Sequence, residues 1–371
     1  MRRWDVYRGR RRSSSRLPSI LLILVSVGFL AFLVLFFTLP GYLVYSKDSV
    51  KLELPGTVGE ETLSAEEEEP EALPETVEEA AAELKYVNPD YSNLNMANTA
   101  ELGLTQSIFI PYEYMNEAGL TKAVSRAREI DVQGLTMELC DESGQLLWAS
   151  KTDIATNYAL GGTYDLKKNV EELNSQGYRL TAVISCCVNS LLVSRNPTWA
   201  LQVADGIVYS DLKGAWLDPW NRNVRQYIID LTKELMEMGF SEVVLDHVEH
   251  PNAQVLYTRS MNAEMSREAC VTNFAIAVRK GVQETMEATG ARLCAMMDTE
   301  AMNNETLDNG QNLSYMLQVF DRVYERTETY TEAGTVVALH VDSTERFVAI
   351  ISWIFPGASW AENYFEPVKK P

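Results

Sequence analysis

The sequence predicts an α/β fold, a (β/α)8 TIM-type barrel, over residues 101–371. From Leu102 onward, short apolar runs alternate with amphipathic stretches. A glycine follows several amphipathic stretches, as at Gly177, Gly239 and Gly290, and glycine is the residue that most readily ends a helix in the left-handed conformation. Strand, helix and glycine repeated in this order are typical of a parallel sheet. The length, about 270 residues, matches a barrel of eight such units.

Five strands are predicted from unbroken or alternating apolar runs, at residues 106–110, 134–139, 179–186, 242–248 and 292–297. Helices are expected between them at residues 120–130, 166–175 and 263–288. The helix before the fourth strand has an apolar face at a spacing close to 3.6 residues. This face consists of Val224, Tyr227, Ile228, Leu231, Leu235 and Met238.

The last quarter of the barrel predicts an irregular closure. Residues 322–325 and 336–340 are expected to form strands six and seven. Residues 347–354 fit either an eighth strand or a helix, but only about six residues separate them from the seventh strand, and a parallel crossover needs about a dozen. Asp342 and Glu345 resemble a capping box. We therefore expect a helix there, with a short final strand within residues 359–365.

The first 45 residues predict a membrane anchor. Seven arginines lie in the basic tail of residues 1–17, and residues 20–39 carry no charge, which is long enough to span a bilayer as a helix. We expect a transmembrane helix over residues 18–45, with the tail in the cytoplasm and the barrel outside the cell. A cleavable signal peptide is the alternative, but the apolar region is long and the small-residue cleavage pattern is missing.

Residues 46–100 predict an acidic, disordered linker. They include the run Glu66–Glu69 and few large apolar residues, so they cannot bury enough surface to offset the entropy of an ordered chain. The formal net charge of −20 indicates a solvated acidic surface. The arginine-rich tail favours contact with anionic lipid over nucleic acid.

The cysteines and histidines predict neither a metal site nor a cofactor. Five cysteines are present without a CxxC spacing, together with three histidines, and buried free thiols are expected. Glycine-rich phosphate loops and the GxSxG serine motif are missing from the sequence.

Three segments resemble a family of bacterial glycoside-hydrolase-like TIM-barrel domains, secreted or membrane-anchored, whose activity is unsettled. The first begins at Asp218-Pro219, continues through Arg225-Gln226-Tyr227 and ends with GFSEVVLDHVEHP, residues 239–251. The second is MELCDESGQLLW, residues 137–148, and the third is NSLLVSRNPTWAL, residues 189–201. Together they cover roughly residues 106–310 and imply a barrel that acts on carbohydrate.

The sequence departs from the family pattern at several strand ends. His247, Glu249 and His250 stand where the family has Tyr, Arg and Phe, and Val188 and Asn189 stand where it has Lys and Asp. These changes remove two cations suited to anionic or polyhydroxylated groups. The chain is therefore expected to handle a different ligand or to have lost catalysis.

Candidate catalytic residues are carboxylates at strand ends, because glycoside hydrolysis normally uses two. Asp246 closes the fourth strand, and Asp298 and Glu300 follow the fifth. Asp246 as nucleophile and Glu300 as acid/base resemble the arrangement of the alpha-amylase superfamily, with Asp298 or Glu249 as other choices. A structural carboxylate bonded to backbone or arginine is the alternative for Asp246.

Candidate substrate-binding residues surround the same end of the barrel. Each has an alternative role, since a loop acid can be merely solvated and a loop tryptophan can be a buried anchor rather than a sugar platform. The candidates are Glu138, Asp141, Trp216, Trp220, His247, His250, His340 and Asp342.

The sequence thus predicts a membrane-anchored extracellular glycoside hydrolase acting on cell-wall or other polysaccharide. A catalytically inactive barrel that binds envelope glycan or a partner protein is the second hypothesis, and a structural spacer is the third. The sugar and the linkage are not encoded in any recognisable motif.

Overall fold

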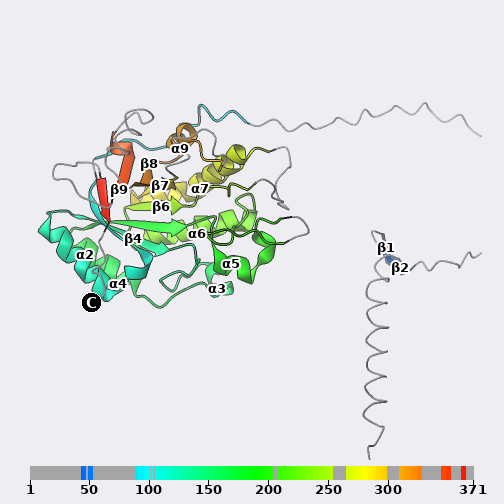
Figure 1. Cartoon of the computed structure of the whole chain (residues 1–371), viewed down its shortest axis with the longest axis horizontal. Coiled ribbons are helices and arrows are strands. Elements are labelled where there is room, and N and C mark those ends of the chain that lie inside the picture. The colour runs from blue at the N-terminus through cyan, green and yellow to red at the C-terminus, as the bar shows by residue number, and fades with distance from the viewer. Residues whose placement is uncertain are drawn as a thin grey trace, which may run out of the picture. The chain divides into compact units, whose positions relative to one another are not determined.

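The computed structural model is a closed barrel of eight parallel strands in the order β10-β3-β4-β5-β6-β7-β8-β9 (Figure 1). The structure describes residues 89–100, 102–103, 105–203, 207–253, 265–298, 309–327 and 344–351, and the backbone of residues 43–46, 49–52 and 361–364. Every neighbouring pair of barrel strands is parallel, so all eight carboxyl ends meet at one mouth.

The strands alternate with helices along most of the chain. The strands are β3 (Ser107–Ile110), β4 (Gly134–Cys140), β5 (Arg179–Ser185), β6 (Glu242–Asp246), β7 (Arg292–Met297), β8 (Arg322–Thr327), β9 (Phe347–Ile351) and β10 (Ala361–Tyr364). The α-helices are α2 (Glu117–Glu129), α3 (Asp153–Asn157), α4 (Leu166–Ser175), α5 (Ser190–Arg195), α6 (Arg222–Met238), α7 (Arg267–Thr289) and α9 (Leu313–Val319). Three short 3-10 helices are η2 (Tyr112–Tyr114), η3 (Pro197–Trp199) and η5 (Thr344–Arg346).

The interior of the barrel is layered, because every second residue of a strand points inward. The middle is apolar and includes Phe109, Val183, Val244, Met296 and Tyr324. On β6 and β8 the inward positions on either side of this layer are charged. The apolar layer therefore separates a polar floor from a polar mouth.

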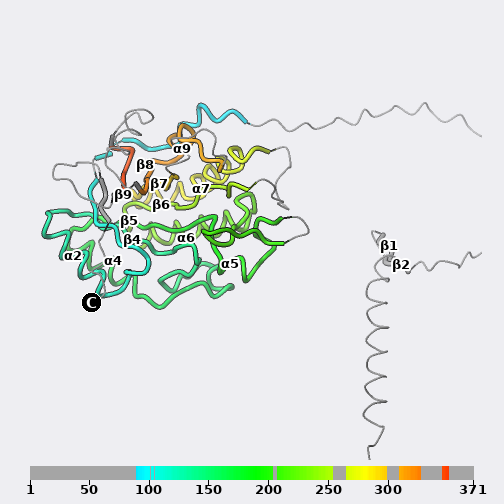
Figure 2. Tube along the Cα trace, viewed as in Figure 1, coloured from blue at the N-terminus to red at the C-terminus, as the bar shows by residue number. Residues whose placement is uncertain are grey.

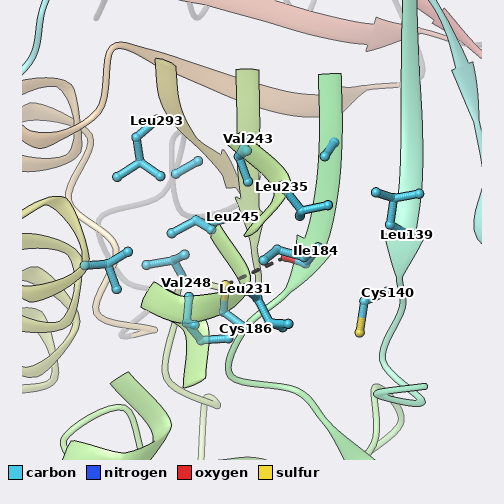
Figure 3. Close-up of a cluster of buried hydrophobic side chains, with 14 of the residues drawn as sticks. Leu139, Cys140, Ile184, Cys186, Leu231, Leu235, Val243, Leu245, Val248 and Leu293 are labelled. Atoms are coloured by element: carbon cyan, nitrogen blue, oxygen red, sulfur yellow. Dashed lines mark hydrogen bonds between the residues drawn. The ribbon is translucent and has the colours of Figure 1, made fainter. Parts of the chain in front are cut away.

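The outer faces of the strands pack against helices, as the amphipathic patterns predict. Leu231 and Leu235 of α6 meet Ile184 of β5 and Val243 and Leu245 of β6 in one buried cluster (Figure 3). Gly239, with φ of +113°, caps the C-terminus of α6 in the left-handed conformation. The predicted helix face and its glycine stop are confirmed.

Residues 89–100 belong to the folded unit, although the sequence places them in the acidic linker. Tyr91 is buried beside Ala269 and Cys270 of α7. The backbone N–H groups of Met96 and Ala97 donate to Gln318 O of α9, at 2.8 Å each. Figure 2 shows this segment running beside α9. The ordered domain therefore begins before the boundary expected at residue 100.

The predicted helix at residues 347–354 is wrong, because Phe347–Ile351 is the strand β9. It pairs with β8 on one side and with β10 on the other, so hydrogen bonding to two neighbours outweighs the helical spacing of its apolar residues. The final strand expected within residues 359–365 is confirmed as β10. The strand predicted at residues 336–340 lies outside the described residues.

Most of the predicted anchor also lies outside the described residues. Residues 43–46 and 49–52 form a two-stranded antiparallel hairpin, β1 (Leu43–Ser46) and β2 (Ser49–Leu52), which overlaps the end of the segment predicted at residues 18–45. Within the described ranges, every helix is too short or too polar to cross a bilayer. All five cysteines are buried free thiols, as predicted.

Candidate active site at the barrel mouth

The floor and the mouth of the barrel draw their charged residues from the same strands. Glu242 and Asp246 are four residues apart on β6, and Arg322 and Arg326 are four residues apart on β8. An even spacing keeps both members of each pair on the inner face. The carboxyl end carries Asp246 and Arg326, where barrel enzymes place their chemistry.

Arg326 joins two carboxylates across the mouth. Its Nη1 lies 2.5 Å from Asp246 Oδ2, and its Nη2 lies 2.6 Å from Glu138 Oε1 on β4. The other oxygen of each carboxylate accepts a backbone N–H, from His247 at 2.7 Å and from Tyr112 at 2.9 Å respectively. One guanidinium thus fixes the positions of two carboxyl groups from different strands.

The two carboxyl groups bridged by Arg326 have opposite pKa shifts. Burial raises the pKa of Glu138 to about 7, because desolvation outweighs the nearby charge of Arg326. Burial also acts to raise the pKa of Asp246, but Arg326 and the N–H of His247 outweigh it and hold the pKa well below its usual range. Near neutral pH the mouth therefore holds one ionised and one partly protonated carboxyl group.

A second cation joins a second pair of acids. Lys213, from the loop after α5, places Nζ 2.6 Å from Glu249 Oε1 and 3.7 Å from Asp298 Oδ2. Burial acts to lower the pKa of Lys213, but Glu249 and Asp298 outweigh it and raise that pKa. Asn309 Nδ2 donates to the other oxygen of Glu249 at 3.0 Å. This cluster is also charged on both sides and firmly held.

Both clusters border one pocket of about 300 Å³ at the mouth. Its charged lining is Glu142, Asp246, Glu249, Asp298, Lys213 and Arg326, with His247 beside them. Met296 and Met297 line an apolar side. A few fixed polar groups around a concave apolar patch are typical of a small-ligand or sugar subsite.

A larger hollow of about 930 Å³ lies between α2 and α4. Its acids Glu117, Asp165 and Glu172 are exposed side chains of these helices or their caps. None is bridged to a second carboxyl group by a cation in the described part of the chain, and none has a resolved pKa shift. The mouth pocket is therefore the better candidate for chemistry.

Several predicted site residues do meet at the mouth. Asp246, Asp298, Glu249 and His247 line the pocket, and Glu138 reaches it through Arg326. Asp141 instead accepts from Ser143 N at 3.0 Å and shapes the turn after β4. The predicted residues Glu300, His340 and Asp342 lie outside the described residues.

The tryptophans and His250 lie away from the pocket lining. Trp216 is buried, so an exposed sugar platform is wrong for this residue and the anchoring alternative holds. Trp220 is half-buried and lies 5.3 Å from Arg225, packed near Tyr91. His250 is buried behind the mouth, where its N–H donates to Asn309 O. Loop packing at these positions outweighed the sequence signal.

Sequence reasoning missed the two cations. Arg326 directly follows the strand predicted at residues 322–325, and reading the residue after each strand would have found it. Lys213 sits in a loop and carries no signal of its own. Together they return two positive charges to the mouth, which the departures at Val188 and Glu249 had seemed to remove.

The fold and site define a carbohydrate-active type of barrel, with cation-bridged carboxylates at the carboxyl ends of its strands. The family model described as "Putative glycosyl hydrolase domain" matches residues 107–325, which is more than half of the chain. The protein belongs to this family of glycosyl hydrolase domains.

Solved structures agree on the fold. The glycoside hydrolase domain of PgaB (BpsB) from Bordetella bronchiseptica has a TM-score of 0.51 at 11% identity, covering 71% of this chain and 93% of that domain. The catalytic domain of a Paenibacillus polymyxa beta-amylase has a TM-score of 0.48 at 9% identity, covering 70% and 91%. A hypothetical protein from Ruminiclostridium thermocellum has a TM-score of 0.44 at 18% identity, covering 51% and 96%. No curated protein matches the chain.

Proposed function

We propose that the protein is a glycoside hydrolase acting on a polysaccharide, with Asp246 and Glu138 as its working pair of carboxyl groups. The observation that carries the proposal is their opposite pKa shifts on one guanidinium group. Environments that separate the pKa values of two neighbouring acids mark acid and base roles in hydrolases. Glu138 replaces the predicted Glu300 as the partner of Asp246 in this proposal.

In this arrangement Glu138 is the general acid and Asp246 the ionised carboxylate. A protonated Glu138 donates to the glycosidic oxygen as the bond to the leaving sugar breaks. The negative charge of Asp246 stabilises the oxocarbenium character that develops at the anomeric carbon. Arg326 keeps both groups in place, and its charge favours the ionised form of Asp246.

The test is glycan release by the full chain, purified and assayed against a panel of hexasaccharides with N-acetylchitohexaose, cellohexaose and xylohexaose among them. Asp246→Asn and Glu138→Gln should each abolish turnover of the cleaved member, and Asp298→Asn shows whether the Lys213 cluster takes part. Asp153→Asn, an exposed position at the start of α3, is the matched control. Turnover that survives Asp246→Asn would overturn the assignment.

An inactive glycan-binding barrel is the second candidate. Both oxygens of Asp246 are engaged, by Arg326 and by the N–H of His247, and a fully engaged carboxylate is a poor nucleophile unless one contact opens. Glycan binding without turnover, unchanged by Asp246→Asn and Glu138→Gln, selects this candidate. A chain that neither binds nor cleaves glycans fits a structural spacer instead.

We also propose that an uncleaved N-terminal helix anchors the barrel outside the cell membrane. The support comes from the sequence alone: the arginine-rich residues 1–17 and the uncharged run at residues 20–39. Protease added to intact cells should then degrade the barrel. The chain should leave the membrane fraction when residues 18–45 are deleted, and an unchanged membrane fraction would contradict the anchor.

A further inference from the structure

His247 has a backbone conformation that few residues adopt. It directly follows β6 and has φ of +52°, in the left-handed region that costs a non-glycine residue roughly 1–2 kcal/mol. Two contacts hold it there. Its N–H donates to Asp246 Oδ1 at 2.7 Å, and its carbonyl accepts from Cys187 N at 3.2 Å. Such strain is concentrated at functional sites.

The contacts of Ser185 determine which nitrogen of the His247 ring carries a proton. Ser185 Oγ lies 2.6 Å from Val188 O and 3.1 Å from His247 Nδ1. A carbonyl can only accept, so the single hydroxyl hydrogen of Ser185 is donated to Val188. Ser185 must therefore accept from the ring, and Nδ1 carries a hydrogen.

The other ring nitrogen faces the pocket. Nε2 lies 3.5 Å from Glu142 Oε1, and Glu142 and His247 both line the pocket. Since Nδ1 is protonated in the neutral ring and in the cation alike, the proton that is gained or lost sits on Nε2. The neutral ring presents a lone pair to the pocket, and the charged ring presents an N–H to Glu142.

We propose that neutral His247 accepts a hydrogen bond from a glycan hydroxyl at Nε2, and that protonation of the ring removes this acceptor. The residue thereby makes glycan affinity depend on pH. The charged groups facing it are Asp246, with Oδ1 3.7 Å from Nδ1, and Glu142; Glu249, Lys213 and Arg326 line the rest of the pocket. The ligand class rests on the proposed function, whereas the position of the proton does not.

Position 247 is also one of the departures from the family pattern, which has Tyr there. A tyrosine hydroxyl stays neutral over the ordinary pH range and both donates and accepts. A histidine changes charge between about pH 5 and 8. The substitution therefore adds a pH response that the family residue lacks.

The first test is nitrogen-15 NMR of the full chain across pH, which reports the tautomer directly. The chain has three histidines, so His340→Asn and His250→Asn identify the His247 signals by elimination. At high pH we expect the Nδ1–H tautomer, and on acidification a shift of Nε2. Ser185→Ala should let the ring change to the Nε2–H tautomer, whereas Ser194→Ala, an exposed serine on α5, should not.

Glu142→Gln removes the anion beside Nε2. The titration midpoint of His247 should then fall, by up to about one pH unit. A high-pH ring with its proton on Nε2 in the unaltered chain overturns the proposal, even if Ser185→Ala fails to fold. A midpoint that does not move in Glu142→Gln overturns the pairing of Nε2 with Glu142.

The second test uses His247→Asn with the hexasaccharide that the panel shows to be cleaved. Asn tolerates the left-handed backbone, and its amide can still donate to Ser185, but it has no atom at the position of Nε2. KM should rise about 3–10-fold, the loss of one hydrogen bond, with kcat nearly unchanged. The KM of the unaltered chain should also rise as pH falls through the midpoint, while that of the variant stays flat.

The two tests separate this inference from the proposed function. If no hexasaccharide is cleaved, the hydrolase proposal fails while the NMR result still decides the tautomer. If glycan is cleaved and His247→Asn leaves KM and its pH dependence unchanged, the acceptor role fails while the hydrolase stands.

Discussion

The floor and the mouth of the barrel use the same kinds of charged residue for different ends. At the floor, Arg322 Nε lies 3.3 Å from Glu242 Oε1, and the two side chains are 2% and 3% exposed. At the mouth, Arg326 contacts Asp246 and Glu138, and its side chain is 33% exposed. The floor pair is sealed below the apolar layer, whereas the mouth group opens into a pocket.

The difference lies in what surrounds each pair. Glu242 also accepts from Tyr324 Oη at 2.5 Å, and Arg322 donates to Glu345 O and Gly103 O at 2.8 Å each. The floor pair therefore holds the base of the barrel together. At the mouth, the second partner of the arginine is another acid with a raised pKa. An ion pair at one end of a strand is structural, and four residues along the same strand it becomes chemically competent.

The largest expected effect breaks the mouth without breaking the fold. Asp246→Asn should lower turnover of the cleaved hexasaccharide by on the order of 10⁴-fold, because it removes the charge that stabilises the transition state. Unfolding by denaturant should change little, since Arg326 keeps Glu138 as a partner. Steady-state kinetics and a denaturation curve on the same sample check both halves.

The next effect breaks the floor. Glu242→Ala should lower the free energy of unfolding by about 3–5 kcal/mol, because it leaves Arg322 buried without its carboxylate. Glu171→Ala, which removes the exposed 3.8 Å pair with Lys167 on α4, should cost less than about 0.5 kcal/mol. Equal losses in the two variants, measured by denaturant unfolding, would contradict the distinction between sealed and open charges.

The pH dependence of stability sharpens the comparison. The pKa of Glu138 rises on folding from about 4.5 to about 7, so between these values the folded state binds more protons than the unfolded chain. Its contribution therefore falls as pH rises through this window, by about 2–3 kcal/mol. Glu138→Gln should flatten that fall. Asp246, with its lowered pKa, acts in the opposite sense and at lower pH. Identical pH slopes in both chains would refute the shift.

The smallest effect lies away from both ends. Ala159, exposed after α3, has φ of +51°. Ala159→Gly should raise the unfolding free energy by up to about 1 kcal/mol by relieving the left-handed strain, with no change in turnover. Thermal unfolding measures the gain, and a lower melting temperature would show that this backbone is not strained.

Much of the fold follows from local patterns. The first six strands and helix α6 match their predicted positions within a few residues, because buried strands read as apolar runs and amphipathic helices repeat every 3.6 residues. The segment at residues 347–351 does not, since five consecutive residues fit both periods. Its pairing with β8 and β10 decided the matter, and that pairing involves residues distant in sequence.

The site divides in the same way. The sequence by itself determined that acids gather at the carboxyl ends of the strands, since Asp246, Asp298 and Glu138 each close or nearly close an apolar run. Only the tertiary structure decided that Arg326 and Lys213 lie between them and that Trp216 is buried. A side chain's charge is written in the sequence, but its pKa and its partner depend on desolvation and distance, which exist only after the strands close into a barrel.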